Sequence, residues 1–472
     1  MAVYYIAAVS SGGSNSNSGT SFSSPWTISK LNTFENAGDL ILINKGDFIG
    51  INVNITRSGT ISNPITYDIY GASANNPILD GSASATPVFT ISGNYVNVKN
   101  IQFQNTTGSN GAVFINSTHD VSVYNCVMNN AIRGIRIANC GSAGVLNVKV
   151  LNSYFYLISD VNNGSGGFTS GGGCYVQYDT CTGSGAEVAY NKGYTDVSTS
   201  HPFVGDLLSF FKLFGTSSSY ALIHDNQLRG GSSDLASGGK CGIGLGDNGG
   251  QYQNVYNNIL INTGFAGIQC AGGDSILINS NKIYGAQFAY SQVGLSVFST
   301  GTPPTNITPG SNIINWTNHG ASIVNLNVGT GVTTPANWST NSPGSYADPG
   351  ASNSLLPDPL FNTGDWNTTV IPVFNYASST NIFTNGSAIL AIGPSVSSAY
   401  YSITSYSISP SLPTGLSFNT TTGYITGTPS VNSVNTTYTI TANNIAGVGT
   451  STISIQVVAS GNTQFYRPIA FR

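Results

Sequence analysis

An asparagine recurs inside a short apolar frame, and this repeat constrains the fold of the chain more than any other feature. The frame places Asn three positions after one apolar residue and two positions before another, as in IHDNQL, VYNNIL and INSNKI. The repeated residues are Asn191, Asn226, Asn258, Asn281 and Asn312, so the differences between successive numbers are 35, 32, 23 and 31. Ile101, Cys126 and Ser153 fill the same slot earlier in the chain.

A second repeat accompanies the first, and each copy is a short strand with alternating apolar residues. It reads GIRIAN, GIGLGD, GIQCAG and GLSVFS, beginning at Gly134, Gly242, Gly267 and Gly294. Two or three strands per unit of about 20–45 residues, without helical patterns between them, predict a stacked β-solenoid. In such a stack each asparagine amide can bond the asparagine one coil above or below. The irregular spacing indicates loops of different length on a regular core.

Composition narrows the classes of partner. Only 7% of the residues are charged and the formal net charge is −4, so no basic surface is available for nucleic acid. No apolar run approaches the about 18 residues that a membrane helix needs. The apolar N-terminal stretch MAVYYIAAVSSGG has no basic residue before it, which argues against a Sec signal peptide.

Residues 283–347 and 366–466 carry no Asp, Glu, Lys or Arg. Surfaces this poor in charge are covered by other subunits or kept soluble by hydroxyls and amides, and we expect a homotrimer.

The six cysteines form no CxxC pair, so neither zinc nor any other metal site is predicted. Cys174 and Cys181 could bridge a loop, and Cys241 and Cys270 could stack on successive coils. The favoured interpretation is that all six are free buried thiols, the other two being Cys126 and Cys140.

The chain resembles the right-handed parallel β-helix proteins of the pectate-lyase-like superfamily. The opening YYIAAVSSGGSNSNSGTSFSSPWTISKLNTFENAGDLILINKGDF is similar to their N-terminal entry, with a short capping helix expected at about 27–35. The phrase DPLF at 358–361 resembles the usual exit from the solenoid. The resemblance implies a β-helix with an N-terminal cap over residues 1–365. It is specific for fold alone, because this fold hosts lyases, hydrolases, adhesins and phage spikes.

A second, smaller domain is expected at 370–459. The pieces LPTGLSF, TTGYITGTP, YTITANNIAG and ISIQV resemble Ig-like modules of bacterial and phage surface proteins, and strands alternate with turns as in a β-sandwich. Residues 460–472 form a tail that either docks on a partner or frays. The predicted fold class is therefore all-β, a parallel β-helix followed by a small Ig-like sandwich.

The segment GDLLSFFKLFGTSSSYALIHDNQLRGG, residues 205–231, gathers several of the chain's few ionisable side chains. Its DLLSFFK portion resembles the acidic-residue, strand and lysine segment of the alginate- and chondroitin-cleaving β-helix lyases. The resemblance implies Lys212 as the base that removes a proton beside a uronate carboxyl, and Asp206 as a ligand of a possible calcium ion. The arginine that this family carries on the next coil is absent from GIGLGDNG, and Arg229 would have to take its role.

A glycosidase would instead need two carboxylates. Asp206, Asp225, Asp234 and Asp247 lie on two successive coils and could supply them, although Asp225 and Asp234 could equally cap bends. The chain has only two glutamates, Glu35 and Glu187.

A glycan-binding surface requires fewer specific side chains than a lyase or glycosidase site does. Gly242, Gly244 and Gly246 alternate with two apolar residues, so the outward side of this strand is expected to be bare backbone, continued by Gly267 and Gly294. Aromatic walls would come from Tyr252, Tyr256, Phe288 and Tyr290. Lys212, Arg229, Asp206 and Asp247 would line the same shallow groove. The alternative is that these glycines allow loops or a second subunit to approach closely.

Three functions are compatible with these features of the sequence. The sequence favours a bacteriophage spike or fibre protein, in a virion with other virion proteins, that binds host-surface polysaccharide. A secreted polysaccharide lyase or glycoside hydrolase and a cell-surface adhesin remain as alternatives. No cofactor is required apart from the possible calcium.

Overall fold

The computed structural model covers 472 residues and divides the chain into two compact units, 1–361 and 362–472. Each unit is described by itself. The described residues are all except 1, 45–46, 71–76, 143, 160–171, 196–204, 231–240, 286–291, 302, 319, 323, 336, 344–372, 377–379, 399–402, 404, 445–446 and 460–472. The predicted exit phrase at 358–361, the tail at 460–472 and three candidate residues, Asp234, Phe288 and Tyr290, fall outside them.

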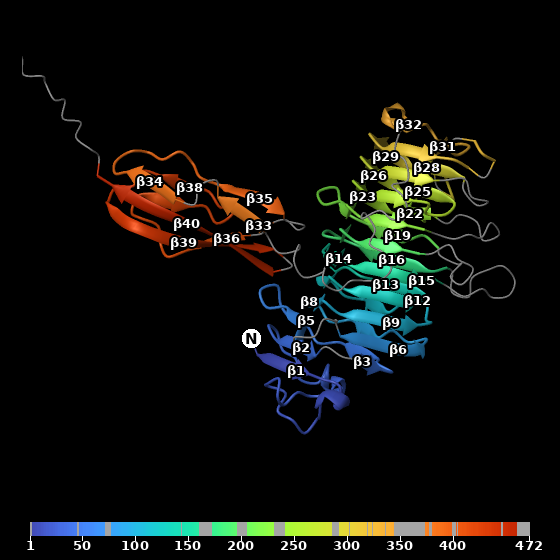
Figure 1. The fold of residues 1–472 in the computed structure, drawn as a ribbon. Helices are drawn as coiled ribbons and strands as arrows, with labels where there is room; N and C mark the ends of the chain where they lie inside the picture. The colour runs from blue at the N-terminus through green and yellow to red at the C-terminus, as the bar shows by residue number, and fades with distance from the viewer. Residues whose placement is uncertain are drawn as a thin grey trace, which may run out of the picture. The chain divides into compact units, whose positions relative to one another are not determined.

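The first unit is a right-handed parallel β-helix in which each full coil contributes one strand to each of three parallel faces (Figure 1). We call these faces sheets one, two and three, although the pairing of β19 with β23 joins sheets one and two into a single 21-stranded sheet. The predicted solenoid and its all-β class are thereby confirmed. Sheet one contains β4 (Val53–Ile55), β7 (Phe89–Ile91), β10 (Val113–Asn116), β13 (Arg133–Ala138), β16 (Cys174–Thr182), β19 (Leu208–Phe214), β22 (Cys241–Leu245), β25 (Ala266–Cys270), β28 (Val293–Val297) and β31 (Leu326–Val328).

The other two sheets repeat this arrangement. Sheet two contains β1 (Val3–Ile6), β2 (Leu40–Asn44), β5 (Ile65–Tyr70), β8 (Val96–Lys99), β11 (Val121–Tyr124), β14 (Val148–Leu151), β17 (Glu187–Ala189), β20 (Ala221–His224), β23 (Gln251–Tyr256), β26 (Asp274–Asn279) and β29 (Thr305–Gly310). Sheet three contains β3 (Asp47–Ile49), β6 (Ile78–Ser84), β9 (Gln102–Thr106), β12 (Val127–Ala131), β15 (Tyr154–Ile158), β18 (Lys192–Tyr194), β21 (Gln227–Arg229), β24 (Ile259–Ile261), β27 (Lys282–Gly285), β30 (Ile313–Trp316) and β32 (Ser342–Pro343).

A continuous hydrophobic core fills the inside of the coils, because alternate residues of every strand point inward. The column Val98, Val123, Val150, Val188 and Ile223 shows this at one position of sheet two, where all five residues are buried and aligned from coil to coil. In-register stacking keeps apolar side chains on one side of the sheet, so the fold is stabilised by burial along its whole length.

The asparagine ladder runs along the turn between sheets two and three. The Nδ2 atoms of Asn191, Asn226, Asn258 and Asn281 each donate to the Oδ1 atom of the next asparagine at 2.9 Å. Asn312 continues the ladder to Asn341 at 2.6 Å. Ser153 occupies the predicted slot, since its backbone N–H donates to Asn191 Oδ1 at 2.8 Å. The predicted ladder is therefore confirmed, and Asn341 is a member that the sequence repeat did not reveal.

A residue in the left-handed region precedes each slot of the repeat from Ile101 to Asn312 and makes the turn tight. Asn125, Asn152, Asn257 and Ser280 adopt φ values of 54°, 45°, 56° and 57° there. Asn tolerates this conformation better than most residues, because its short polar side chain bonds locally. The outer asparagines bond between coils as well, as Asn152 Nδ2 does to Asn125 Oδ1 at 3.2 Å.

The N-terminal cap is a 3₁₀ turn at Ile28–Lys30, called η2, so the expected helix at about 27–35 is wrong in length and type. Glu35 is buried beneath this cap, where its carboxylate accepts hydrogen bonds from the backbone N–H of Asn32 at 2.6 Å and from Tyr67 Oη at 3.2 Å. Tyr4 and Phe34 pack around Trp26. Glu35 is thus a structural residue that holds the first coil.

All six cysteines are free and buried, which confirms the favoured interpretation. The pairing of Cys174 with Cys181 is wrong, because both lie on the single strand β16. Cys241 and Cys270 do not stack either, since Cys241 aligns with Ala266 and Cys270 aligns with Leu245.

The second unit is an Ig-like module with its own core, which contains Tyr376, Tyr438, Ile440, Ile453 and Ile455. A four-stranded sheet follows the order β34 (Thr380–Thr384), β40 (Gly447–Val458), β39 (Ser433–Asn444) and β36 (Ser405–Ser409). Two hairpin-like pairs complete it, namely β33 (Val373–Tyr376) with β35 (Pro394–Ser398) and β37 (Leu416–Phe418) with β38 (Ile425–Gly427). In neither unit do the described residues include a helix with the length and apolarity needed to span a membrane.

Candidate functional site

Two of the predicted charged residues meet at the corner between sheets one and two. The backbone N–H of Lys212, in β19, donates to the carbonyl oxygen of Asp247, which follows β22 on the next coil, at 3.1 Å. Lys212 itself has φ +50°, so the strand kinks at this residue, a conformation uncommon outside glycine and asparagine. The lysine ammonium lies 5.2 Å from the centroid of the Phe211 ring.

Aromatic side chains surround this pair. Phe214 aligns with Gln251, so Tyr252 lies directly beside the end of β19. The rings of Tyr220 and Tyr252 pack edge to face with centroids 5.6 Å apart. We call this set the aromatic corner, and its members are all partly exposed: Phe211, Lys212, Phe214, Tyr220, Asp247 and Tyr252.

Asp206 lies at the opposite end of β19, six residues or about 20 Å of extended chain away from Lys212. Its Oδ1 accepts hydrogen bonds from the backbone N–H of Cys241 at 3.2 Å and from the Cys241 thiol at 3.3 Å. Ser209 Oγ donates to its Oδ2 at 3.4 Å. Calcium prefers a shell of oxygen ligands, and a carboxylate bonded to a thiol and a backbone N–H does not fit that role. Within the described residues no group of three or more His, Cys, Asp or Glu side chains is arranged to hold a metal ion.

Arg229 lies in a different sheet from the other predicted catalytic residues. It is part of β21 in sheet three, aligned with Tyr194 and Ile261, whereas Lys212 is in sheet one. The single groove expected from the sequence is therefore corrected to the aromatic corner, which keeps Lys212, Asp247 and Tyr252.

The glycine floor is also corrected, because neighbouring chain covers it. A Cβ atom on Gly242 would lie 2.7 Å from the carbonyl oxygen of Gly267, and one on Gly246 would lie 2.2 Å from that of Gly272. A Cβ on Gly244 would lie 2.7 Å from Asp206 Oδ2. The alternative interpretation holds at these positions, since the glycines allow close approach of other segments.

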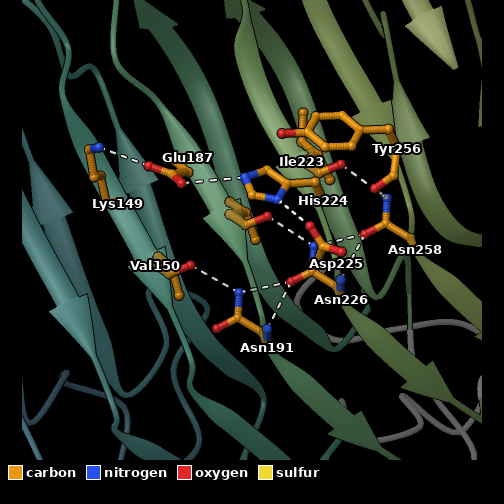
Figure 2. A network of polar contacts seen from close by, with 11 residues as sticks. Lys149, Val150, Glu187, Asn191, Ile223, His224, Asp225, Asn226, Tyr256 and Asn258 are labelled. Atoms are coloured by element: carbon orange, nitrogen blue, oxygen red, sulfur yellow. Dashed lines mark hydrogen bonds and ion pairs between the residues drawn. The ribbon is translucent and has the colours of Figure 1, made fainter. Parts of the chain in front are cut away.

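Tyr256 belongs to a second cluster, a chain of charges that crosses the outer side of sheet two (Figure 2). Lys149 Nζ on β14 bonds Glu187 Oε2 on β17 at 2.8 Å. Glu187 Oε1 in turn lies 3.3 Å from His224 Nε2 on β20, and His224 Nδ1 lies 2.7 Å from Asp225 Oδ2. The His224 ring stacks on Tyr256 with centroids 4.6 Å apart and planes 4° apart. We call Lys149, Glu187, His224 and Asp225 the charge relay of sheet two.

The pKa values of this cluster shift together. Burial would raise the pKa of Glu187, but its bonds to His224 and Lys149 outweigh burial and hold that pKa at about 2. Burial would lower the pKa of His224, yet hydrogen bonds to Glu187 and Asp225 raise it above its ordinary value. Both ring nitrogens of His224 face carboxylates, so the protonated ring has no nitrogen left to act as a base. The cluster is therefore suited to joining coils rather than to proton transfer in catalysis.

The sequence placed His224 and Asp225 near Lys212 but did not reveal their partners. Lys149 and Glu187 are 38 residues apart, and Glu187 and His224 are 37 apart. The available signal was that Glu187 is one of only two glutamates and lies four residues before the ladder residue Asn191. Asp225, with φ +53°, also occupies the left-handed turn position before Asn226, as the bend-capping alternative predicts.

Comparison with known proteins identifies two matching family models. Residues 371–459 match the family described as "Putative Ig domain", which agrees with the Ig-like module. Residues 27–144 match the family described as Chondroitinase B. This second match covers N-terminal coils and ends before Lys212. None of the curated proteins compared with the chain matches it in sequence.

Several solved β-helix structures are similar to the first unit. Pectate lyase Pel9A shares 18% identity with a TM-score of 0.44, over 66% of this chain and 79% of that one. An alginate lyase from Paenibacillus sp. str. FPU-7 shares 14% identity with a TM-score of 0.42, over 65% of this chain and 95% of that one. XylC, in a complex with xylose, shares 11% identity with a TM-score of 0.48, over 69% of this chain and 70% of that one. At these values the similarity carries no argument about the site.

Proposed function

We propose that the chain is a polysaccharide-binding β-helix protein and that the aromatic corner holds the glycan. The observation that carries this proposal is the meeting of Lys212, Asp247 and the Tyr220–Tyr252 pair at one partly exposed corner. Ligand sites combine apolar and aromatic walls with a few polar groups that fix orientation. A sugar offers the matching chemistry, since its C–H faces pack on aromatic rings and its hydroxyls both donate and accept hydrogen bonds.

Binding requires less of this corner than hydrolysis would. Hydrolysis by the usual route needs two carboxylates on either side of the glycosidic bond, and the aromatic corner as defined contains one, Asp247. The lysine and the carboxylate together suit a neutral or weakly acidic glycan, because each can bond hydroxyls and Lys212 can also pair with a uronate.

β-Elimination is a second candidate, favoured by the match of residues 27–144 to the Chondroitinase B family. In this case Lys212 would remove the proton beside a uronate carboxyl. Asp206 is engaged by Cys241 and Ser209, so the carboxyl would have to be neutralised by a group other than a calcium ion on Asp206.

Replacing Lys212 with alanine is expected to weaken polysaccharide binding by about tenfold or more, because a charge-assisted hydrogen bond contributes about 1.5–3 kcal/mol. Tyr252→Ala should have a similar effect, whereas Lys282→Ala in sheet three should not. The measurement is retention in affinity electrophoresis on gels containing neutral or uronate polysaccharides. Unchanged retention of both corner variants would refute the proposed site. Release of unsaturated, ultraviolet-absorbing products by the wild type but not by Lys212→Ala would replace binding with elimination.

We further propose that the glycan is on a host surface and that the chain is a spike or fibre subunit of a bacteriophage virion. The combination of a β-helix with an Ig-like module supports this, as does the resemblance of the module to those of bacterial and phage surface proteins. A secreted protein and a cell-surface adhesin are the alternatives. Detection of the chain in purified virus particles, rather than in culture supernatant or the cell envelope, would distinguish them.

The same proposal predicts a homotrimer together with contacts to other virion proteins. The prediction rests on the stretch 283–347, which lacks Asp, Glu, Lys and Arg and contains β28, β29, β30, β31 and β32 at one end of the helix. Light scattering on the purified chain is expected to give three times the mass of one chain. A stable monomer at micromolar concentration would show that this uncharged stretch needs no subunit to cover it.

A further inference from the structure

We propose that the charge relay of sheet two is a pH-dependent latch that ties three successive coils together while His224 is protonated and frees the turn at Asp225 when that proton is lost. The relay links β14, β17 and β20 through side chains, in addition to the backbone hydrogen bonds of the sheet. Its charges alternate along the chain of contacts, from Lys149 to Glu187, His224 and Asp225.

Each element packed against His224 contributes a titratable side chain that faces it. Glu187 comes from β17 and Asp225 from the following turn. Tyr190, in the turn after β17, meets the imidazole edge to face at 5.3 Å, and Tyr256 on β23 stacks on it. Lys149 reaches the group indirectly through Glu187. The protonated imidazole therefore lies between two carboxylates and two phenol rings.

Loss of one proton removes one of the two N–H donors of the ring. The bare nitrogen would then face a carboxylate oxygen at either 3.3 Å or 2.7 Å, both acceptors. Lys149 holds the Glu187 carboxylate in place, whereas His224 is the one side chain among the described residues that bonds the Asp225 carboxylate, so Asp225 is the partner that can move away. The Asp225 side chain is 35% exposed and can turn to water, whereas the His224 side chain is 6% exposed and cannot.

Release of Asp225 acts on the asparagine ladder. Asp225 adopts φ +53° and is followed directly by Asn226, whose backbone N–H and Nδ2 both donate to Asn258 Oδ1. A left-handed conformation at a residue other than glycine persists only when its surroundings hold it. The turn at 225–226 is therefore expected to open more often once Asp225 loses the imidazolium.

The pH window follows from the two pKa shifts. Because the folded-state pKa of His224 is raised, its contribution is complete below the ordinary value of about 6.5 and is lost as pH rises through the raised value. Because the pKa of Glu187 is lowered to about 2, its contribution is complete above its ordinary value and is lost as pH falls towards 2. The contribution of the latch to stability is thus complete between about pH 5 and 6.5, and the latch opens as pH rises through the raised pKa of His224.

The chain supplies its own control in a second histidine of similar construction. His119 Nδ1 lies 2.6 Å from Asp120 Oδ2, and its ring meets Tyr95 edge to face at 5.5 Å. The described residues show no second carboxylate bonded to His119 comparable to Glu187. His119 therefore provides a comparison in which one carboxylate, rather than two, bonds the imidazole.

The test is a pH titration of the full chain with isotope-labelled histidine, followed by NMR at the ring nitrogens, with His224→Gln to assign the signal. His224 is expected to keep both N–H protons above the ordinary imidazole pKa of about 6.5, because Glu187 and Asp225 both bond the ring. Glu187→Gln should lower the His224 pKa, because it removes one of the two carboxylates. A His224 pKa at or below the ordinary value, or no change in Glu187→Gln, would overturn the latch.

Hydrogen exchange supplies the conformational readout. Protection factors of the Asp225 and Asn226 amides, which already account for the intrinsic pH dependence of exchange, should fall at least about tenfold as His224 loses its proton. Those of the matching amides of Asn257 and Asn258 on the next coil should change less. If protection at 225–226 stayed constant through the titration of His224, the ring would titrate without acting as a latch, and the proposal would fail.

Discussion

Replacing Asn258 with leucine is expected to lower the free energy of unfolding of the β-helix by about 3–5 kcal/mol, the range for a broken buried polar network. Asn258 is fully buried and lies in the middle of the ladder. Its Oδ1 accepts from the backbone N–H and the Nδ2 of Asn226, and its Nδ2 donates to Asn281 Oδ1 and to the carbonyl of Ile223. Leucine has nearly the same shape but leaves a backbone N–H and a carbonyl without partners, at about 1–3 kcal/mol each.

The matched control is the preceding residue, Asn257, which is exposed and adopts φ +56°. Asn257→Gly should change stability by no more than about 0.5 kcal/mol, because glycine adopts this conformation without strain. The free energy of unfolding of both variants is measured by urea denaturation, and the two substitutions lie in the same turn. An Asn258→Leu variant as stable as the control would mean that stacking of the ladder adds nothing to burial of the coils.

The ladder also shows what the sequence could predict about this fold. Asn226, Asn258 and Asn281 sit in a complete apolar frame, while Asn191 and Asn312 keep an apolar residue on one side, and burial of the frame fixes the register against the next coil. Asn341 escaped prediction because it lies in ANWSTNSP, without the apolar frame, and is reached through η3 (Trp338–Thr340). The Oδ1 atom of Asn341 accepts a hydrogen bond from the Nδ2 atom of Asn312, so Asn341 takes the next position of the ladder without the sequence frame.

Side chains on the outside of the helix were harder to predict, for a physical reason. Loops of different length separate the strands, so contacts between coils join residues such as Lys149 and Glu187, 38 positions apart. No periodic apolar pattern marks the outer positions, because they are not in the core. Asp206 and Lys212 looked adjacent in sequence, yet an extended strand puts six residues about 20 Å apart. The expectation that Asp247 lies beside Lys212 came from matching strands on successive coils, and the pairing of β19 with β22 brings these two residues together.

Adding one methyl group at Gly267 is expected to destabilise the β-helix by about 3 kcal/mol or more, the upper end for overpacking a filled core. A Cβ on Gly267 would lie 2.3 Å from Ile283 Cγ2 and 2.5 Å from the carbonyl oxygen of Gly294. Ile283 is fully buried on β27, and Gly294 is backbone on the next coil. Neither can move without separating coils, so the strain is not relieved by a simple rotation of a side chain.

Gly301→Ala provides the comparison, since a Cβ there would meet nothing within 4 Å. Glycine at 301 is exposed, and its replacement should leave stability unchanged or slightly raised, through loss of freedom in the unfolded chain. Thermal unfolding by circular dichroism is the measurement. If Gly267→Ala unfolded at the same temperature as the wild type while Gly301→Ala behaved as expected, β25 and β27 would have room between them for the added methyl group. The glycine at 267 would then not be required for the close approach of these two coils.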